Sequence, residues 1–391
     1  MSERKNIPGF WRLFFREASI IAKDHSLLLT LLIAPLLYAF FYGSIYMYKE
    51  EEGVKLAIVD DDNSNLSRLL TQQISNAQIT STFKTASLNT AQEEMYKGNC
   101  QGFFYIEKGL EQKVLTLHQA DVVLTVNAAR FLPSSDLLMG LNQICLTVSA
   151  GVRLQYLQKS EGQSSQISMQ EVMPVNLNYK PLFNERSSYG AFLLPGLLAL
   201  ILQQTLLIGL SASVASERNK KKVNEWMQTA GNNLSVALWG KGFFYLILFG
   251  AYAFFFLNVN FNILQLPMRG SKIDLAFALF LFIATLIPMG QCLGSLFKQT
   301  LLNVQIMAFS TYPIFLITGY TWPLKSLPVA LQWISALLPT TPFLKVYQSI
   351  VQAGGTLSQN KGALIHLLIL LIFYSLLCFV RFRKIRKVEE L

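Results

Sequence analysis

The sequence has few charged residues for its length. Only 14% of its 391 residues are Asp, Glu, Lys or Arg, whereas 52% are hydrophobic. A typical soluble domain has about 25% charged residues. Such a chain cannot cover a water-facing surface with its own polar groups, which excludes a soluble enzyme, a disordered protein and a small domain held together by disulfides. The composition predicts a membrane protein.

Motifs for nucleotide and metal chemistry are also absent. The sequence contains no Gly-x-x-x-x-Gly-Lys-Ser/Thr, and Gly240-Lys241 lacks both the upstream glycine and the following hydroxyl of that phosphate-binding loop. The three histidines, His25, His118 and His366, are too far apart in the chain to predict a zinc site or a His-based triad. No predicted span carries an interior charge of the kind that ion-coupled carriers use. Any uphill transport would therefore take its energy from another chain.

Six uncharged stretches are long enough to cross a hydrocarbon core of roughly 30 Å as helices. They are residues 27–48, 188–216, 242–268, 275–297, 299–324 and 362–380. The first run is too long for the apolar core of a cleavable signal peptide, and no Ala-x-Ala site follows it, so it resembles a signal anchor.

The basic residues predict the topology of these spans. The whole chain has a formal charge of +10, but residues 49–187 carry 12 Lys and Arg against 15 Asp and Glu. The segments on the predicted inner side hold 16 basic residues, including those of the 381–391 tail, and the short outer segments hold five. Because Lys and Arg in short loops stay in the cytoplasm, both termini are expected there and residues 49–187 outside. The charge thus indicates topology rather than nucleic-acid binding.

Two further segments are predicted to be helical without spanning. Apolar and aromatic residues within positions 1–26 recur at helical spacing, which predicts an amphipathic helix in the cytoplasmic interface, the alternative being an unstructured tail. They are Phe10, Trp11, Phe14, Phe15, Ala18, Ile21 and Ala22. Residues 325–361 are apolar but interrupted by prolines and by Gly354-Gly355, so we expect two short helices that enter or cap the outer leaflet.

Residues 49–187 have a soluble composition and predict a small α/β domain inserted between the first and second spans. Apolar runs and turn residues give the expected elements. These are strands at 54–59, 79–84 and 100–106, further strand candidates at 114–117 and 122–126, a helix through Leu66–Ile74, a helix at 88–98, an amphipathic helix at 136–158 capped by Ser134 or Ser135, a linker at 159–170 and a return strand at 172–179.

Acidic residues and cysteines in this domain leave two questions open. The sequence Asp60-Asp61-Asp62-Asn63 could bind a hard cation, but no second acidic cluster is evident, so turn formation and helix capping are favoured. Cys100 and Cys145 could form a disulfide in an oxidising compartment, although free thiols are favoured because Cys145 falls on an apparent core face. Cys292 and Cys378 fall within spans and are expected to pack there.

Four segments resemble the ABC-2-type permeases, the membrane subunits of ABC exporters, and most closely the bacterial drug-efflux-like branch. Residues 54–76 resemble the start of its external domain, and residues 275–298 its fourth span. Residues 217–231 resemble the coupling helix of type V exporters, although Glu217-Arg218-Asn219 departs from the usual Glu-Arg/Lys-Glu opening. Residues 312–355 resemble the signature of the fifth span and outer helices, which includes Pro313, Gly319, Pro323, Pro328, Pro339 and Pro342.

The resemblance implies a permease without enzymatic activity of its own, in the inner membrane of a bacterial cell. It would bind no cofactor and would work with an ABC ATPase that uses ATP and Mg. It implies a second permease copy, identical or paralogous, contact with membrane lipid, and an optional periplasmic adaptor and outer-membrane channel. The expected cargo is amphipathic, drug-like or lipid-like. The alternative is a membrane-anchored extracytoplasmic sensor or envelope-assembly protein without transport activity.

By the same resemblance, residues 217–231 and the N-terminal helix would dock on the ATPase. Val223, Trp226, Met227 and Ala230 recur at i, i+3, i+4 and i+7 and form an apolar ridge, which could instead rest on acidic lipid. The residues expected at the ATPase contact are Glu217, Arg218, Val223, Glu225, Trp226, Met227, Gly231, Trp11, Phe14 and Phe15.

Cargo would pass, by resemblance, between the second and fifth spans of two permease copies. Polar and flexible side chains lie on one face of the fifth span, within about 100°, and at membrane depth in the second span. The same side chains could instead bond neighbouring helices, and the sequence favours neither role. They are Gln203, Gln204, Ser211, Asn303, Met307, Ser310, Thr311, Ile314 and Thr318.

Overall fold

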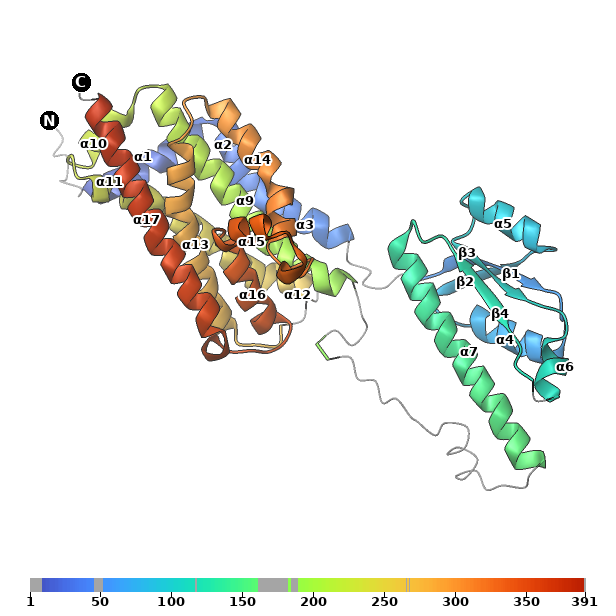
Figure 1. The fold of residues 1–391 in the computed structure, drawn as a ribbon. Coiled ribbons are helices and arrows are strands. Elements are labelled where there is room, and N and C mark those ends of the chain that lie inside the picture. Colours follow the sequence, from blue (N-terminus) through green and yellow to red (C-terminus); the bar gives the residue numbers. More distant parts are fainter. Residues whose placement is uncertain are drawn as a thin grey trace. The chain divides into compact units, whose positions relative to one another are not determined.

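The structure is a computed structural model that describes residues 9–45, 52–116, 118–160, 182–183, 189–264, 266 and 268–389. The chain forms two compact units, one made of Met1–Lys49 with Pro181–Leu391 and the other of Glu50–Lys180. The first unit is helical and the second contains a β-sheet; Figure 1 labels helices and strands of both.

The α/β unit contains a mixed sheet of four strands in the order β2-β1-β3-β4. The strands are β1 (Val54–Asp60), β2 (Thr80–Lys84), β3 (Gly102–Ile106) and β4 (Val122–Val126). Strand β1 is parallel to β2 and β3, with Leu56 opposite Thr82 and Gly102, and β4 is antiparallel to β3. The helices are α4 (Asn65–Ser75), α5 (Leu88–Tyr96), α6 (Leu110–Leu115) and α7 (Phe131–Ser160).

The sheet is covered by helices on both faces. The alternation of side chains along β1 places Leu56 and Ile58 in a core with α4 and α7, and Ala57 and Val59 in a second core with α5. Strands β2 and β3 lie on opposite sides of β1 in the sheet. The connection from β1 to β2 through α4 and the connection from β2 to β3 through α5 therefore run across the sheet in opposite directions. Because such connections are right-handed, α4 and α5 cover opposite faces.

The two cysteines of this unit pack in different cores, because Cys100 belongs to the core beside α5 and Cys145 to the core beside α7. Both thiols are free. The sheet lies between Cys100 and Cys145, so the two cysteines are free thiols and do not form the disulfide that the sequence left open.

The strands expected near 54–59, 79–84, 100–106 and 122–126 are present. The candidate strand at 114–117 is wrong, because Val114 and Leu115 lie in the short helix α6 and Thr116 is its C-cap; residue 117 lies outside the described residues. Helix α7 begins earlier than expected, at Phe131, and Ser134 lies inside it, where its hydroxyl donates to the Asn127 carbonyl oxygen at 2.6 Å. The expected return strand at 172–179 and nearly all of the linker lie outside the described residues.

The helical unit contains long helices joined by short ones. Its first part is α1 (Gly9–Lys23), α2 (His25–Leu28), the π-helix η1 (Leu29–Ile33), α3 (Ala34–Ile45), α9 (Tyr189–Asn219), α10 (Val223–Thr229) and α11 (Leu234–Phe255). It continues with the π-helix η2 (Phe256–Asn260), α12 (Phe261–Ile263), α13 (Lys272–Gly294), α14 (Thr300–Ile317), the 3₁₀ helix η3 (Leu324–Ser326), α15 (Val329–Ala336), α16 (Thr340–Val351), the 3₁₀ helix η4 (Leu357–Asn360) and α17 (Lys361–Glu389).

Seven helical segments of the described chain are long and apolar enough to cross a membrane. Six coincide with the runs expected from the sequence, and the seventh is Phe131–Lys159 of the α/β unit. This helix packs on the sheet through Leu137 and Leu141. The expectation that it is amphipathic needs correction, because Leu138 and Leu146 on its other sides are apolar and exposed.

Four long helices of the helical unit form a row, with α13 and α9 in the middle and α17 and α14 on either side (Figure 1). In the apolar stretches of α9 and α13, 78% and 67% of the residues are buried, whereas in the apolar stretches of α14 and α17 the buried share is 17% each. Helices α9 and α13 approach closely at Gly294, where a Cβ atom would lie 2.5 Å from the Ser211 carbonyl oxygen. The two outer helices keep an apolar face available for lipid or another chain.

The proline-rich segment forms two short helices, as expected. Pro328 and Pro339 occupy the positions just before α15 and α16, where a proline does not remove a needed N–H donor. Gly319 ends the α14 region with a φ of +84°, which a residue with a side chain rarely adopts. Both short helices have fewer than 13 residues, too few to span. The remaining signature prolines are Pro313 inside α14, Pro323 before η3 and Pro342 in the first turn of α16.

Candidate coupling site and translocation path

The expected apolar ridge of the coupling segment faces the interior of the helical unit. Val223, Trp226, Met227 and Ala230 are all buried, and Trp226 has no exposed surface. The Trp226 indole donates a hydrogen bond to the Ala237 carbonyl oxygen at 3.2 Å, and its ring meets Phe382 of α17 edge to face. The ridge is therefore an internal packing surface of the helical unit, and burying these side chains within the chain is itself favourable. Docking of the coupling segment on an ATPase stays a prediction.

The polar face of α10 is the side that remains open to a partner. Asn224, Glu225 and Gln228 are exposed, and Glu225 forms a surface ion pair with Lys222 at 3.7 Å. Gly231 follows α10 with a φ of +68°, which closes the helix and turns the chain toward α11. We call Asn224, Glu225 and Gln228 the polar face of α10.

Helix α1 packs on α11 through a face that includes Ile21 of the expected apolar face, together with Leu13 and Glu17, which were not expected there. Leu13, Glu17 and Ile21, at i, i+4 and i+8, are its buried residues. Phe14 is half-buried with its ring 5.4 Å from that of Phe244. Trp11 and Phe15, also expected at a docking site, are exposed apolar side chains.

Buried charges join α1, α9 and α11. Glu17 and Lys241 are each 1% exposed, and the Lys241 Nζ atom lies 2.6 Å from Glu17 Oε2. The Tyr245 hydroxyl donates to Glu17 Oε1 at 2.9 Å, and Lys241 also donates to the Ser213 hydroxyl at 2.8 Å. Glu217, near the end of α9, lies 3.8 Å from Lys241.

Arg16 completes this group with a bidentate contact to Glu217 at 2.6 and 2.9 Å. Burial alone would lower the pKa of Arg16, but its hydrogen bond and attraction to Glu217 outweigh burial, so the pKa is raised and the charge is kept. We call Arg16, Glu17, Ser213, Glu217, Lys241 and Tyr245 the Glu17 cluster. Its two carboxylates and two cations balance, as buried charges must.

The Glu17 cluster also touches the coupling segment. Lys241 Nζ lies 5.2 Å from the centre of the Trp226 ring, so the cation faces the indole of α10. Gly240 and Gly242 flank Lys241, and a Cβ atom on either would lie within 3 Å of Leu13 or Ile287. These glycines let α1 and α13 approach α11 on both sides of the lysine.

Sequence reasoning found Glu217 but missed Glu17, Lys241 and Tyr245. The predicted span began at 242, one residue after Lys241, so its charge was assigned to a loop. The sequence did contain one indication of a buried ion pair. Glu17 lies one helical turn from both Leu13 and Ile21, and a carboxylate on an apolar helix face predicts a cationic partner.

Most residues expected along the cargo path bond α9 to its neighbours within one chain. Asn303 Nδ2 donates to the Ser211 hydroxyl at 2.8 Å, and the Gln204 amide donates to the Met307 carbonyl oxygen. Gln203 accepts a hydrogen bond from Thr340 of α16. All of these side chains are buried. Of the two roles left open by the sequence, the structure shows the packing role for them.

Another face of α14 is free. Phe309 is 83% exposed and Tyr312 is 68% exposed, whereas Ser310 and Thr311 between them are half-buried and donate to carbonyl oxygens of their own helix. Thr318, at the end of α14, is buried and bonded to Phe315.

Comparisons with known proteins show the family of this chain. A family model described as ABC-2 family transporter protein matches residues 25–380. The chain belongs to the ABC-2 transporter family. It is 23% identical over 381 residues to the "Probable multidrug ABC transporter permease YbhR" of Escherichia coli (strain K12), covering 95% of this chain and 99% of that protein. The protein of the same name from Escherichia coli O157:H7 gives the same values.

Family membership establishes two properties of this ABC-2 permease. It is a multi-pass membrane protein, in keeping with the apolar helices of the helical unit. ABC permeases carry no nucleotide-binding domain, so the ATP that drives this one is hydrolysed by a partner ATPase.

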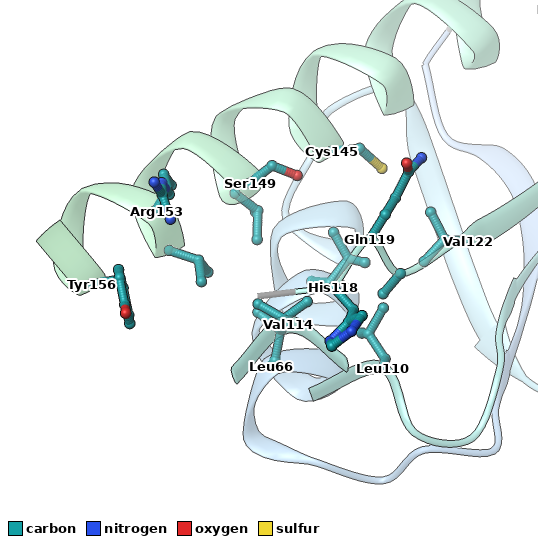
Figure 2. Close-up of a pocket in the computed structure, with 14 residues that line it drawn as sticks. Leu66, Leu110, Val114, His118, Gln119, Val122, Cys145, Ser149, Arg153 and Tyr156 are labelled. Carbon is teal, nitrogen blue, oxygen red and sulfur yellow. The ribbon is translucent and has the colours of Figure 1, made fainter. Parts of the chain in front are cut away.

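The α/β unit of the permease contains a cavity of about 360 Å³ (Figure 2). Figure 2 shows apolar side chains such as Leu66, Leu110 and Val114 on one wall and α7 on the other. The His118 imidazole and the Arg153 guanidinium line the cavity from opposite sides. The volume lies at the lower end of the 300–1,000 Å³ typical of small-molecule sites.

The acidic sequence after β1 builds turns. The Asp60 carboxylate accepts hydrogen bonds from the Asp62 and Asn63 amides, and Ser64, rather than an aspartate, caps α4. Asp62 accepts from the amides of Gly109 and Glu111 at the start of α6. Within the described ranges, no group of three or more His, Cys, Asp or Glu residues could hold a metal ion.

Proposed function

We propose that this permease is the membrane half of an exporter for amphipathic, drug-like or lipid-like molecules. The Escherichia coli relative, whose name gives it a probable multidrug role, supports the drug-like class, since it aligns along nearly the whole chain. The exposed apolar and aromatic face of α14 supports a cargo with a large apolar part. ATP hydrolysis by the partner ATPase would move this cargo out of the cytoplasm or the inner leaflet.

The Glu17 cluster is the observation that carries the proposed coupling mechanism. Separating α1 from α9 or α11 would leave a buried charge without its partner, a change that destabilises proteins by about 3–5 kcal/mol. Helices α1, α9 and α11, together with α10 beneath Lys241, would therefore move as one body. A push by the ATPase on the polar face of α10 would reach two spans at once.

The cargo path in this proposal lies along the free face of α14 and between two permease copies. Phe309 and Tyr312 would contact cargo or the second copy, with Ser310 and Thr311 beside them. The buried residues of the predicted path, including Gln204, Ser211 and Asn303, would hold α14 against α9. The second copy would be this chain or a paralogue.

The proposed topology places both termini in the cytoplasm and the α/β unit outside. It is supported by the excess of basic residues in the segments that join α9 to α11 and follow α17. Six spans fit this arrangement, with α7 packed on the sheet outside the membrane. In a bacterial inner membrane the α/β unit would then face the periplasm, where an adaptor and outer-membrane channel could receive cargo.

The alternative, an anchored sensor or envelope-assembly protein without transport, explains less of the structure. The cavity of the α/β unit suits a sensor, but an anchor needs neither the Glu17 cluster nor a free face on α14. Family membership also favours transport.

Co-reconstitution with the ATPase subunit tests the proposal. Making the polar face positive, by Glu225→Arg with Gln228→Arg, is expected to lower cargo-stimulated ATP hydrolysis and transport at least tenfold. The matched control is Lys325→Glu, an exposed change in the segment before α15 at the predicted outer end. Undiminished coupling in the double variant, or a purified chain that binds no ATPase, would favour the sensor.

A further inference from the structure

Helix α7 carries one apolar stripe that serves both the core and the cavity of the α/β unit. Leu137 and Leu141, in its first half, are buried against the sheet. The stripe continues through Cys145, Val148 and Val152 at the helical spacing of three or four residues, and these half-buried side chains line the cavity. The second half of α7 therefore extends the core face of the helix along one wall of the cavity.

The opposite wall comes from α4, α6 and Val122 of β4. Leu70 and Leu110 are buried core residues, whereas Leu66 and Val114, each one turn away on the same helix, are half-buried. Figure 2 shows Leu66, Leu110 and Val114 on the side that faces α7. Apolar side chains from four elements thus form a surface that the apolar body of a ligand would cover favourably.

Two nitrogen-bearing side chains lie on opposite sides of these apolar walls (Figure 2). The Arg153 guanidinium of α7 lies over the ring of Tyr156, 5.5 Å from its centre, which helps to fix the position of the charge. The His118 amide donates to the Lys113 carbonyl oxygen at 2.9 Å, and His118 Nδ1 lies 3.1 Å from the Thr116 hydroxyl. A guanidinium stacked on an aromatic ring keeps its N–H donors in one plane, where they match the two oxygens of a carboxylate.

We propose that this cavity binds a small amphipathic carboxylate. The carboxylate lies on Arg153, the apolar body lies between α7 and the wall of α4 and α6, and a polar group at the other end would meet His118. Because a volume of about 360 Å³ is at the lower end for small-molecule sites, a compact aromatic or short-chain acid fits better than a phospholipid. The inference concerns the α/β unit alone and does not depend on which cargo is exported.

An apolar segment of a partner protein is the competing occupant. The charge of Arg153 favours an occupant that brings its own anion, and the modest volume favours a small molecule over a helix with its side chains. Both observations support the acid.

Cys145 gives a local measure of binding, because it lines the cavity. The full-length protein in lipid nanodiscs is alkylated with iodoacetamide, and peptide mass spectrometry follows the rates at Cys145 and Cys100. Cinnamate, the probe, is expected to slow alkylation of Cys145 saturably and to leave the rate at Cys100 unchanged, because Cys100 belongs to the core on the other face of the sheet. Cinnamamide has the same shape without the negative charge, so it should bind about tenfold more weakly or worse.

The variant Arg153→Glu should reverse this charge preference. In this variant cinnamate should lose about tenfold or more of its affinity, and cinnamylamine, a cation of similar shape, should protect Cys145 instead. The matched control is Lys159→Glu, the same charge change at an exposed position of the same helix, outside the residues that line the cavity. It should keep both affinities within a few fold.

Four results would overturn the inference. Equal weakening of cinnamate binding in both variants would leave only diffuse attraction between charges. Protection by cinnamamide as strong as that by cinnamate would remove the carboxylate from the proposal. Failure of both cinnamate and octanoate to protect Cys145 would exclude small aromatic and short-chain acids. Protection by an added adaptor protein, with none by these acids, would assign the cavity to a protein partner.

Discussion

Replacing Lys241 by methionine tests whether the Glu17 cluster holds the helices together. The change keeps an unbranched side chain of similar length but leaves Glu17 buried and without its cation. Both residues are 1% exposed and their charged atoms are 2.6 Å apart, so solvent cannot replace the lost partner. Breaking a buried pair of this kind destabilises by about 3–5 kcal/mol.

The expected loss can be measured as a shift in the unfolding temperature of the detergent-purified protein. At about 2–4 °C per kcal/mol for a large domain, Lys241→Met should lower the midpoint by about 6–20 °C. The matched control is Lys222→Met, because the Lys222–Glu225 pair is exposed and is worth at most about 1 kcal/mol. Its midpoint should fall by no more than about 4 °C.

A second variant separates pairing from packing. Glu17→Gln with Lys241→Met removes both charges, so the double variant should be more stable than the sum of the two single losses predicts. The reasoning is refuted if Lys241→Met is no more destabilising than Lys222→Met, or if the two losses simply add.

Four further outcomes are expected. Burial raises the pKa of Asp62, but hydrogen bonds from Ser64 and the α6 amides outweigh burial, so the pKa is lowered. Asp62→Asn should therefore destabilise the protein at pH 7 and make little difference once the pH falls below that lowered pKa. Thermal unfolding at several pH values measures this dependence. Cys100 should react slowly with maleimide at pH 7 because burial raises its thiol pKa, and non-reducing peptide mapping should find no bond to Cys145. Gly294→Leu should prevent the close approach of α9 and α13 and abolish stable expression, whereas the same change at Gly250, which has open space beside it, should be tolerated. Phe309→Cys should cross-link two copies in membranes if α14 faces its counterpart, and a lack of cross-links at this position would contradict the proposed path.

Much of the fold could be predicted from the sequence, because it depends on patterns that lie close together in the chain. Long uncharged runs are found by counting, and the short outer helices follow from prolines that stop them. The β1 strand alternates little in polarity because both of its faces are buried, and it was still recognisable as a continuous apolar run. The 114–117 segment was misread because a short apolar run fits a strand or a helix equally well.

The candidate site was harder to predict because it depends on contacts between distant residues. Glu17 and Lys241 are 224 positions apart, and no local pattern links them. The ridge of α10 was recognised correctly as apolar, but periodicity cannot tell whether such a ridge packs inside the chain or against a partner. Polar residues of the second and fifth spans presented the same ambiguity; the structure shows Asn303 bonded to Ser211, a contact between distant residues that no local pattern indicates.

The placement of Glu17 on α1 also has a practical consequence for anyone who produces this protein. Helix α1 precedes the first apolar run, so it resembles a leader that could be trimmed or replaced by a purification tag. A shortened chain starting at the first span would retain Lys241 and Glu217 yet lose the carboxylate and the guanidinium that neutralise them. Fusions are therefore better placed at the opposite terminus, with the chain kept whole from Gly9 onward.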